Sequence, residues 1–320
     1  MPTLVLIQAL RALAAILVVI FHANMMLGYW AGMTFLWLDR GAFGVDLFFV
    51  ISGFIMTYIS WGQFGASGAS RDFLYRRLTR IVPLYWLITT VVVVMGHYPA
   101  WRVIGSYFFF WTGEQPVVNV GWTLDYEMLF YAIFAAGLTM PRVLGLCAIA
   151  LALIVVHLFG GDFYGGGRTE QFTMGMGLAA LYWAGVRIPM TAQALLFVSG
   201  LVWLALLPAG TSDWLTYGAI ATAMVAAAVL GPVLVENKTT RGIVLLGDAS
   251  YALYLIHLPI VRGGATALRD GATVNLAALA IPYIAIAVCC SIGVAIVLHL
   301  YVERPMLALF RRLLLRPAAA

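Results

Sequence analysis

The stretch LIQALRALAAILVVIFHAN, residues 6–24, is long and apolar enough to cross a bilayer as a helix. Arg11 stands in its middle and His22 near its end. A charged side chain at the bilayer centre costs roughly 2.5–3.5 kcal/mol on insertion scales. At 100° per residue, Arg11 and His22 project from nearly one side of the helix, roughly 16 Å apart. We therefore expect both to face a polar channel inside a bundle rather than lipid.

The rest of the chain has the composition of a membrane protein. Of its 320 residues 63% are hydrophobic and 10% are charged, and the mean hydropathy is +0.98. So few charges exclude a soluble globular protein, and no basic tract interleaved with aromatics suggests nucleic acid. Cys147, Cys289 and Cys290 fall in apolar runs, without the spacing of a disulfide framework or a metal site.

Apolar runs predict an all-α, polytopic membrane bundle of about ten transmembrane helices. The expected spans are 4–23, 40–60, 81–98, 120–138, 143–159, 170–187, 192–208, 213–234, 246–262 and 275–302. A short aromatic helix at 101–111 is expected at the membrane interface or re-entering between the third and fourth spans. We see no internal repeat and no linker that would separate two domains.

The distribution of basic residues predicts the orientation. If the N-terminus is cytoplasmic, 12 Arg and Lys residues fall in the inner connections and the C-terminal tail, and 5 in the outer connections. The positive-inside rule then places both termini in the cytoplasm, which agrees with an even number of spans.

Ionisable residues within apolar spans are candidates for function by default. Besides Arg11 and His22 these are Asp46 in GVDLFFVISGF, Asp125 and Glu127 in GWTLDYEMLFY, and His257 in SYALYLIHLPI. In the predicted topology His22, Asp46, Glu127 and His257 share the outer half of the membrane.

A basic cluster and a hydroxyl stripe complete the candidate site. Arg76, Arg77 and Arg80 of RRLTR lie at the inner face, where they could hold a cytosolic polyanion. Ser250 and Tyr254 share a helix face with His257, at i, i+4 and i+7, as part of a polar channel or as interhelical hydrogen-bonding groups. A cationic inner layer and an outer layer of histidines and carboxylates suit transfer of a group across the membrane.

Six stretches resemble the acyltransferase-3 family of integral-membrane acyltransferases. They are LRALAAILVVIFH, GVDLFFVISGFIM, FLYRRLTRIVPLYW, GWTLDYEMLFY, LGDASYALYLIHLPI and VERP, and together they extend over nearly the whole chain. Each is weak alone, but their order and spacing are those of the family. WTLDYEM and IQALRALAA look most like the branch that O-acetylates bacterial exopolysaccharides.

The resemblance implies transfer of an acetyl group from cytosolic acetyl-CoA to a hydroxyl of an extracytoplasmic or lipid-linked glycan. It puts the family's Arg-x10-His motif on Arg11 and His22, its Arg-x-x-Arg motif on Arg77 and Arg80, and its fourth-span carboxylate on Glu127. It also implies a multi-pass protein of the bacterial cytoplasmic membrane. We expect one integral-membrane acyltransferase domain over 1–320, without an appended soluble domain, a permanently bound cofactor or a metal.

Each candidate has alternatives. His22 is a general base, a transient acyl acceptor or a packing histidine. Glu127 and Asp46 orient the base or pair structurally, and Glu127 is the carboxylate expected beside the His22 imidazole. Arg11 binds the donor or forms an ion pair, Arg76, Arg77 and Arg80 bind CoA phosphates or only satisfy the inner charge bias, and Asp125 caps or pairs.

Two other classes of membrane protein, transporters and non-catalytic assembly proteins, can also contain charged residues within their spans. A secondary transporter or glycan exporter would also need a polar channel. Such proteins often show paired repeats and broken helices at the midplane. We find no repeat, and the charges are layered, which favours the enzyme. A non-catalytic partner in polysaccharide assembly would not need a base and an anion site on opposite faces. The partners expected of the enzyme are acetyl-CoA, a glycan acceptor and the bilayer, with assembly proteins or a second copy left open.

Overall fold

The described chain is entirely helical in its regular structure, as predicted. The structure, a computed structural model, describes residues 4–208, 211, 213–234, 236–271 and 276–314. Its elements are α1 (Val5–Ala31), η1 (Leu36–Ala42), α2 (Phe43–Ser60), α3 (Ala69–Met95), α4 (Ala100–Phe108), η2 (Asn119–Gly121), α5 (Trp122–Gly137), α6 (Arg142–Phe159), α7 (Gly161–Tyr164), α8 (Thr169–Trp183), α9 (Met190–Leu206), α10 (Trp214–Leu230), α11 (Arg241–Gly271), α12 (Leu276–Leu298), η3 (His299–Glu303) and α13 (Arg304–Leu314).

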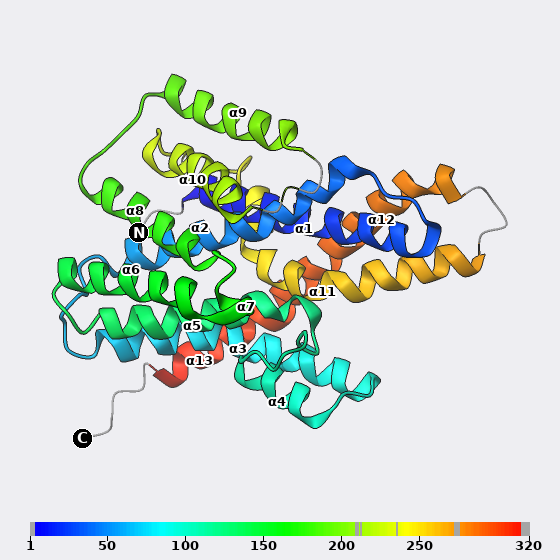
Figure 1. Cartoon of the computed structure of the whole chain (residues 1–320), viewed down its shortest axis with the longest axis horizontal. Helices are drawn as coiled ribbons and strands as arrows, with labels where there is room; N and C mark the ends of the chain where they lie inside the picture. Colours follow the sequence, from blue (N-terminus) through cyan, green and yellow to red (C-terminus); the bar gives the residue numbers. More distant parts are fainter. Residues whose placement is uncertain (1–3, 209–210, 212, 235, 272–275, 315–320) are drawn as a thin grey trace.

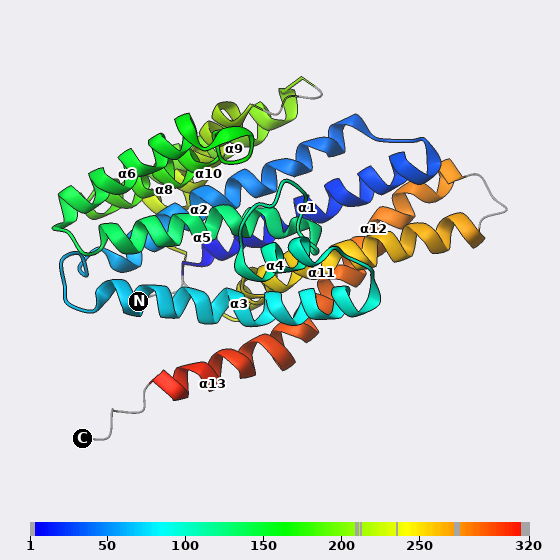
Figure 2. The ribbon, with the colours of Figure 1, turned by 60° about the horizontal axis from the view of Figure 1, so that its bottom comes forward.

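The long helices lie side by side in an elongated bundle, with the short helix α4 at its flank (Figure 1). Helix α1 packs along α11 and against α2, and α2 packs along α8. Turning the molecule shows α3 on one side of this centre, with α13 below it and α6, α8, α9 and α10 on the opposite side (Figure 2). The helices that carry most of the predicted site residues, α1, α2, α3, α5 and α11, are therefore neighbours.

Among the residues that the structure describes, six helical segments are long and apolar enough to cross a membrane. They are Val5–Tyr29, Leu36–Ser60, Ala69–Met95, Arg142–Phe159, Arg241–Ala267 and Ala278–Phe310. The other long helices, α5, α8, α9 and α10, have 15 to 17 residues. Large apolar side chains are bare on the outside of the bundle; Val94 and Phe159 are each 80% exposed. This is the surface of an integral, multi-pass membrane protein.

Every predicted span overlaps one of the ten long helices, but the boundary of the third is wrong. Helix α3 begins at Ala69, not at residue 81, so the RRLTR cluster is helical. The sequence pattern excluded its charges from an apolar span, whereas Arg and Leu are good helix formers that extend a helix beyond the hydrocarbon. The predicted aromatic helix is α4. Arg316, part of the basic C-terminal tail, lies outside the described residues.

Glycines let the central helices approach closely. A Cβ added at Gly53 of α2 would overlap the carbonyl oxygen of Phe172 in α8, and one added at Gly175 of α8 would overlap that of Val50 in α2. Small residues at such crossings bring backbones into contact, which drives helix association where lipid removes most of the hydrophobic driving force. These contacts fix α2, one wall of the site, against α8.

The connections gather at two ends of the bundle. At one, which we name the basic end (residues 61–77, 138–142 and 184–188), Trp61 stacks with Trp183 at 6.0 Å and Arg142 lies 4.6 Å over Trp61. At the other, the aromatic end (residues 35–42, 100–121 and 161–168), Trp111 stacks on Phe163 with ring centroids 4.1 Å apart.

Candidate active site

A cavity of about 150 Å³ opens between α1, α2, α3, α5 and α11. Arg11, Arg77, Arg80 and Glu127 are the charged residues in its lining, and α2 contributes much of the apolar wall, including Phe48 and Ile55. Three guanidinium groups against one carboxylate make this enclosure cationic, which favours an anionic ligand with an apolar portion.

Helical geometry separates the arginines of α3. Arg77 and Arg80 are three residues apart, so both reach the cavity, whereas Arg76 is turned away and exposed. The structure therefore does not bring Arg76 to the cavity with the other two arginines: it lies about 100° around the helix from Arg77, on the exposed side of α3.

Glu127 lies in the cavity and not beside an imidazole. Its carboxylate accepts a hydrogen bond from the hydroxyl of Ser52 at 3.1 Å and another from the hydroxyl of Tyr131, four residues along α5. Because Thr123, Glu127 and Tyr131 recur every four residues, one face of α5 supplies all three to the lining. The expected contact between Glu127 and His22 is not what the structure has.

His22 and His257 form a contact between α1 and α11, which we name the histidine pair. Nε2 of His257 lies 3.2 Å from Nδ1 of His22, and the ring centroids are 4.9 Å apart. His257 is fully buried, whereas His22 is partly exposed. The sequence predicted both residues, and the structure brings them together.

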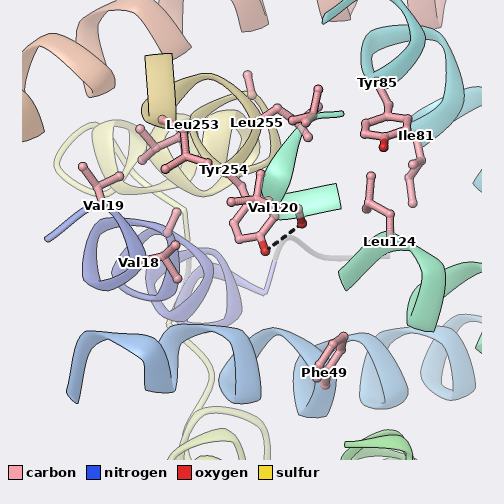
Figure 3. Close-up of a cluster of buried hydrophobic side chains, with 14 of the residues drawn as sticks. Val18, Val19, Phe49, Ile81, Tyr85, Val120, Leu124, Leu253, Tyr254 and Leu255 are labelled. Carbon is pink, nitrogen blue, oxygen red and sulfur yellow. Dashed lines mark hydrogen bonds between the residues drawn. The ribbon is translucent and has the colours of Figure 1, made fainter. Parts of the chain in front are cut away.

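Tyr254 separates the histidine pair from the cavity. Its ring lines the cavity and lies 6.0 Å, centroid to centroid, from that of His257. Its hydroxyl accepts from Thr123 at 3.0 Å and donates to the carbonyl of Val120 at 3.2 Å (Figure 3). Ser250, one helical turn back along α11, is fully buried and also lines the cavity. Ser250, Tyr254 and His257 thus form the predicted stripe from cavity to imidazole.

The remaining carboxylates of the prediction lie elsewhere. Asp46 is buried and accepts from the Nε2 of Gln171 in α8 at 2.6 Å; it is turned away from the cavity, which its neighbour Val45 lines. Asp125 is buried and does not line the cavity, and its Oδ2 has no hydrogen-bond partner among the described residues.

A second polar cluster, not foreseen as a unit, braces the cavity's arginines. We name it the arginine clamp (Arg80, Asp248, His299, Glu303 and Arg304). His299 Nδ1 lies 2.7 Å from Glu303, which also faces Arg80 at 3.7 Å, and Arg304 donates to His299 Nε2 at 3.0 Å and faces Asp248 at 3.7 Å.

The clamp extends to α1 through a glutamine that sequence reasoning missed. Gln8 donates to Asp248 at 2.9 Å, and its own oxygen accepts from Arg11 at 3.3 Å. His299 and Glu303 sit on a π-helical turn, a widening that often marks functional positions. The signal for this cluster was present: a histidine inside an apolar run, four residues before the VERP glutamate.

Comparison with known proteins decides the family. The family described as Acyltransferase domain, acyltransferase-3, matches residues 5–300. The chain belongs to this family. It is therefore an acyltransferase, and the resemblance drawn from the six motifs is confirmed. Family membership also favours an enzyme over the transporter and the assembly partner.

Three relatives illustrate what this acyltransferase is similar to. The exopolysaccharide production protein ExoZ of Rhizobium meliloti (strain 1021) is 36% identical, with 83% of this chain and 90% of its own length aligned. The peptidoglycan O-acetyltransferase OatA of Listeria monocytogenes is 27% identical, and the O-acetyltransferase OatA of Staphylococcus aureus 24%, each over 80% of this chain. The acyltransferase spans about half the length of these two. No solved structure matches it.

Proposed function

We propose that this acyltransferase is an O-acetyltransferase that moves an acetyl group from acetyl-CoA, bound from the basic end, to a glycan hydroxyl presented at the aromatic end. The observation that carries the proposal is an order of groups that leads from the cavity to His22. Ser250, Tyr254 and His257 follow one another along α11 from the cationic cavity, and His257 contacts His22 of α1, which is partly exposed.

The cavity suits the donor. Arg77 and Arg80 would hold phosphate oxygens of CoA by charge-assisted hydrogen bonds, since guanidinium groups match phosphate geometry. Arg11, which lines the same cavity, would donate hydrogen bonds to the carbonyl groups of the pantetheine arm. The apolar wall of α2, with Phe48 and Ile55, would receive the uncharged part of that arm.

His22 is the group that would activate the acceptor. As the glycan oxygen attacks the thioester carbonyl, its proton passes to the imidazole and a carbon–oxygen bond forms. The carbon–sulfur bond then breaks, and the imidazolium returns the proton to the leaving thiolate, which departs as CoA. General base catalysis of this kind is typically worth about 10² to 10⁴ in rate.

An exopolysaccharide or its lipid-linked precursor is the acceptor that the relatives favour. ExoZ, whose name refers to exopolysaccharide production, aligns over 90% of its own length. The peptidoglycan relatives align over about half of theirs and are less similar. Of these relatives, ExoZ is thus the one whose alignment covers most of both proteins, and an exopolysaccharide acceptor agrees with its name.

The sidedness follows from the charge bias. We propose ten spans with both termini in the cytoplasm, which puts the basic end inside and the aromatic end outside. A single cysteine at 66–70 should react with an impermeant thiol reagent only from the cytoplasm, and one at 163–166 only from outside. Cys147, Cys289 and Cys290 are exposed and must first be replaced. Reversed labelling would reject the orientation.

Purified enzyme in liposomes tests the reaction. Acetyl-CoA carrying a labelled acetyl group is supplied on one side and the polysaccharide on the other, with mass spectrometry of the product. We expect ester-linked acetate on the glycan only when acetyl-CoA faces the basic end. In cells, deletion of the gene should remove acetyl esters from the polysaccharide. Transfer from another donor but not from acetyl-CoA would reject the donor, and unchanged polysaccharide would reject the acceptor.

A further inference from the structure

The protons of the histidine pair can be assigned from its contacts. Nδ1 of His257 lies 3.2 Å from the carbonyl oxygen of Leu253, one turn back on α11. A carbonyl can only accept, so this nitrogen carries hydrogen. A neutral imidazole has one N–H, and Nε2 of His257 is therefore a bare acceptor.

The same accounting applies to His22. Its Nδ1 lies 2.9 Å from the carbonyl oxygen of Val18 and 3.2 Å from Nε2 of His257. Both neighbours are acceptors, so Nδ1 of His22 must be the donor, and in the neutral ring its Nε2 is unprotonated. No hydrogen bond to Nε2 of His22 is made within the part of the chain that the structure describes, and His22 is the partly exposed member of the pair.

The opposite assignment fails on the same contacts. If His257 carried its proton on Nε2 instead of Nδ1, the lone pair of Nδ1 would face the lone pairs of the Leu253 carbonyl oxygen. Nδ1 of His22 would then have to accept from His257, and its lone pair would face the Val18 carbonyl oxygen. Each such clash leaves a buried polar group unsatisfied, at a cost of about 1–3 kcal/mol. One arrangement alone satisfies these three contacts, with the Nδ1–H of His22 shared between the Val18 carbonyl and Nε2 of His257, and it leaves Nε2 of His22 as the basic nitrogen.

We infer that His257 is a positioning residue, which accepts the Nδ1–H of His22 and so holds His22 with a bare Nε2 ready to take the acceptor proton; this rests on the proposed role of His22 as base. When Nε2 takes that proton, the positive ring keeps its Nδ1–H bonded to His257. A neutral imidazole thus takes the place that a carboxylate holds beside many catalytic histidines, without a second permanent charge inside the membrane.

The tautomer can be measured without any activity. The chain has 5 histidines, so protein labelled with ¹⁵N-histidine gives few imidazole signals in nanodiscs. Above the pH at which the rings titrate, His22 and His257 should both show a protonated Nδ1 and a bare Nε2. Loss of one set of signals in His22→Gln assigns them. A His22 ring protonated at Nε2 would overturn the inference.

Two substitutions at 257 test the positioning role. His257→Leu removes the acceptor with little change in size, and kcat should fall by about 10- to 100-fold while the KM for acetyl-CoA stays within about 2-fold. His257→Gln offers a carboxamide oxygen to the Nδ1–H and should recover much of kcat. His97→Gln, the same change at an exposed loop histidine, is the matched control. Equal kcat in the Leu and Gln variants, or wild-type kcat in the Leu variant, would overturn the inference.

His22→Ala separates this inference from the function on which it rests. If His22→Ala is inactive and His257→Leu is fully active, the base stands and the positioning role falls. If His22→Ala keeps its turnover, the proposed base falls, and His257→Leu should then also be active.

Discussion

Two histidines of this acyltransferase, His299 and His22, are held in opposite ways. In the arginine clamp, His299 is bonded to the carboxylate of Glu303 and receives a hydrogen bond from Arg304. In the histidine pair, His22 meets another imidazole and a backbone carbonyl. Both nitrogens of His299 are occupied, whereas His22 keeps one nitrogen without a protein partner among the described residues.

This difference suits one histidine to a structural role and the other to proton transfer. A histidine with both nitrogens bonded cannot take a proton from a substrate unless it first breaks a contact, so His299 is suited to hold α3, α12 and α13 together. A histidine with one bare nitrogen can accept a proton as soon as a hydroxyl arrives. The clamp contacts the cavity's arginines, and in the proposed reaction the histidine pair would supply the base.

Removing the free histidine should have the largest effect. His22→Ala should leave the protein folded and able to bind acetyl-CoA while turnover falls by about 10² to 10⁴. His22→Gln should be no better, since an amide cannot accept the proton. Turnover, size-exclusion profile and acetyl-CoA binding are compared with His97→Ala, which changes an exposed loop histidine. Near-normal turnover would contradict the role, and acetate trapped on His22 would replace the base with covalent catalysis.

Breaking the clamp should cost stability. Glu303→Ala removes the carboxylate shared by Arg80 and His299, and loss of one partner of a buried ion pair costs about 3 to 5 kcal/mol. Equilibrium unfolding in detergent micelles measures this loss, with Glu114→Ala in an exposed loop as the control. A loss below about 1 kcal/mol would show that the clamp is not a structural element.

The cavity's arginines should affect the donor alone. In Arg77→Gln/Arg80→Gln the KM for acetyl-CoA should rise by about 10- to 100-fold, since each charged hydrogen bond is worth about 1.5–3 kcal/mol, while the KM for the glycan stays nearly constant. Arg76→Gln, one position away and exposed, is the matched control. Equal increases for both substrates, or an equal effect of Arg76→Gln, would count against a donor site.

The hydroxyl between the two regions should have the smallest effect. Tyr254→Phe removes hydrogen bonds to Thr123 and Val120, a change of about 0.5–1.5 kcal/mol, so kcat should fall by no more than about 10-fold. Tyr283→Phe removes a comparable bond, to the carbonyl of Val261, away from the cavity. If Tyr254→Phe is as damaging as His22→Ala, the hydroxyl itself contacts the reacting atoms.

The sequence located the helices and most of the site's components. Runs of apolar residues predicted each long helix, because in lipid the backbone must satisfy its own hydrogen bonds. Ionisable residues in or beside such runs are costly to insert into a membrane, so they were selected as candidates. These were Arg11, His22, Arg77, Arg80 and His257. Where α3 begins was missed, since charged turns beyond the membrane remain helical without being apolar.

Only the tertiary structure decided which of these residues meet. His22 and His257 lie 235 positions apart, and a helix pattern gives a face and a depth but not the neighbour on the other helix. The rotation of each helix in the bundle brought His257 rather than Glu127 to His22 and turned Arg76 and Asp46 away from the cavity. Helix rotation depends on packing between distant parts of the chain, as where Gly53 and Gly175 bring the backbones of α2 and α8 into contact.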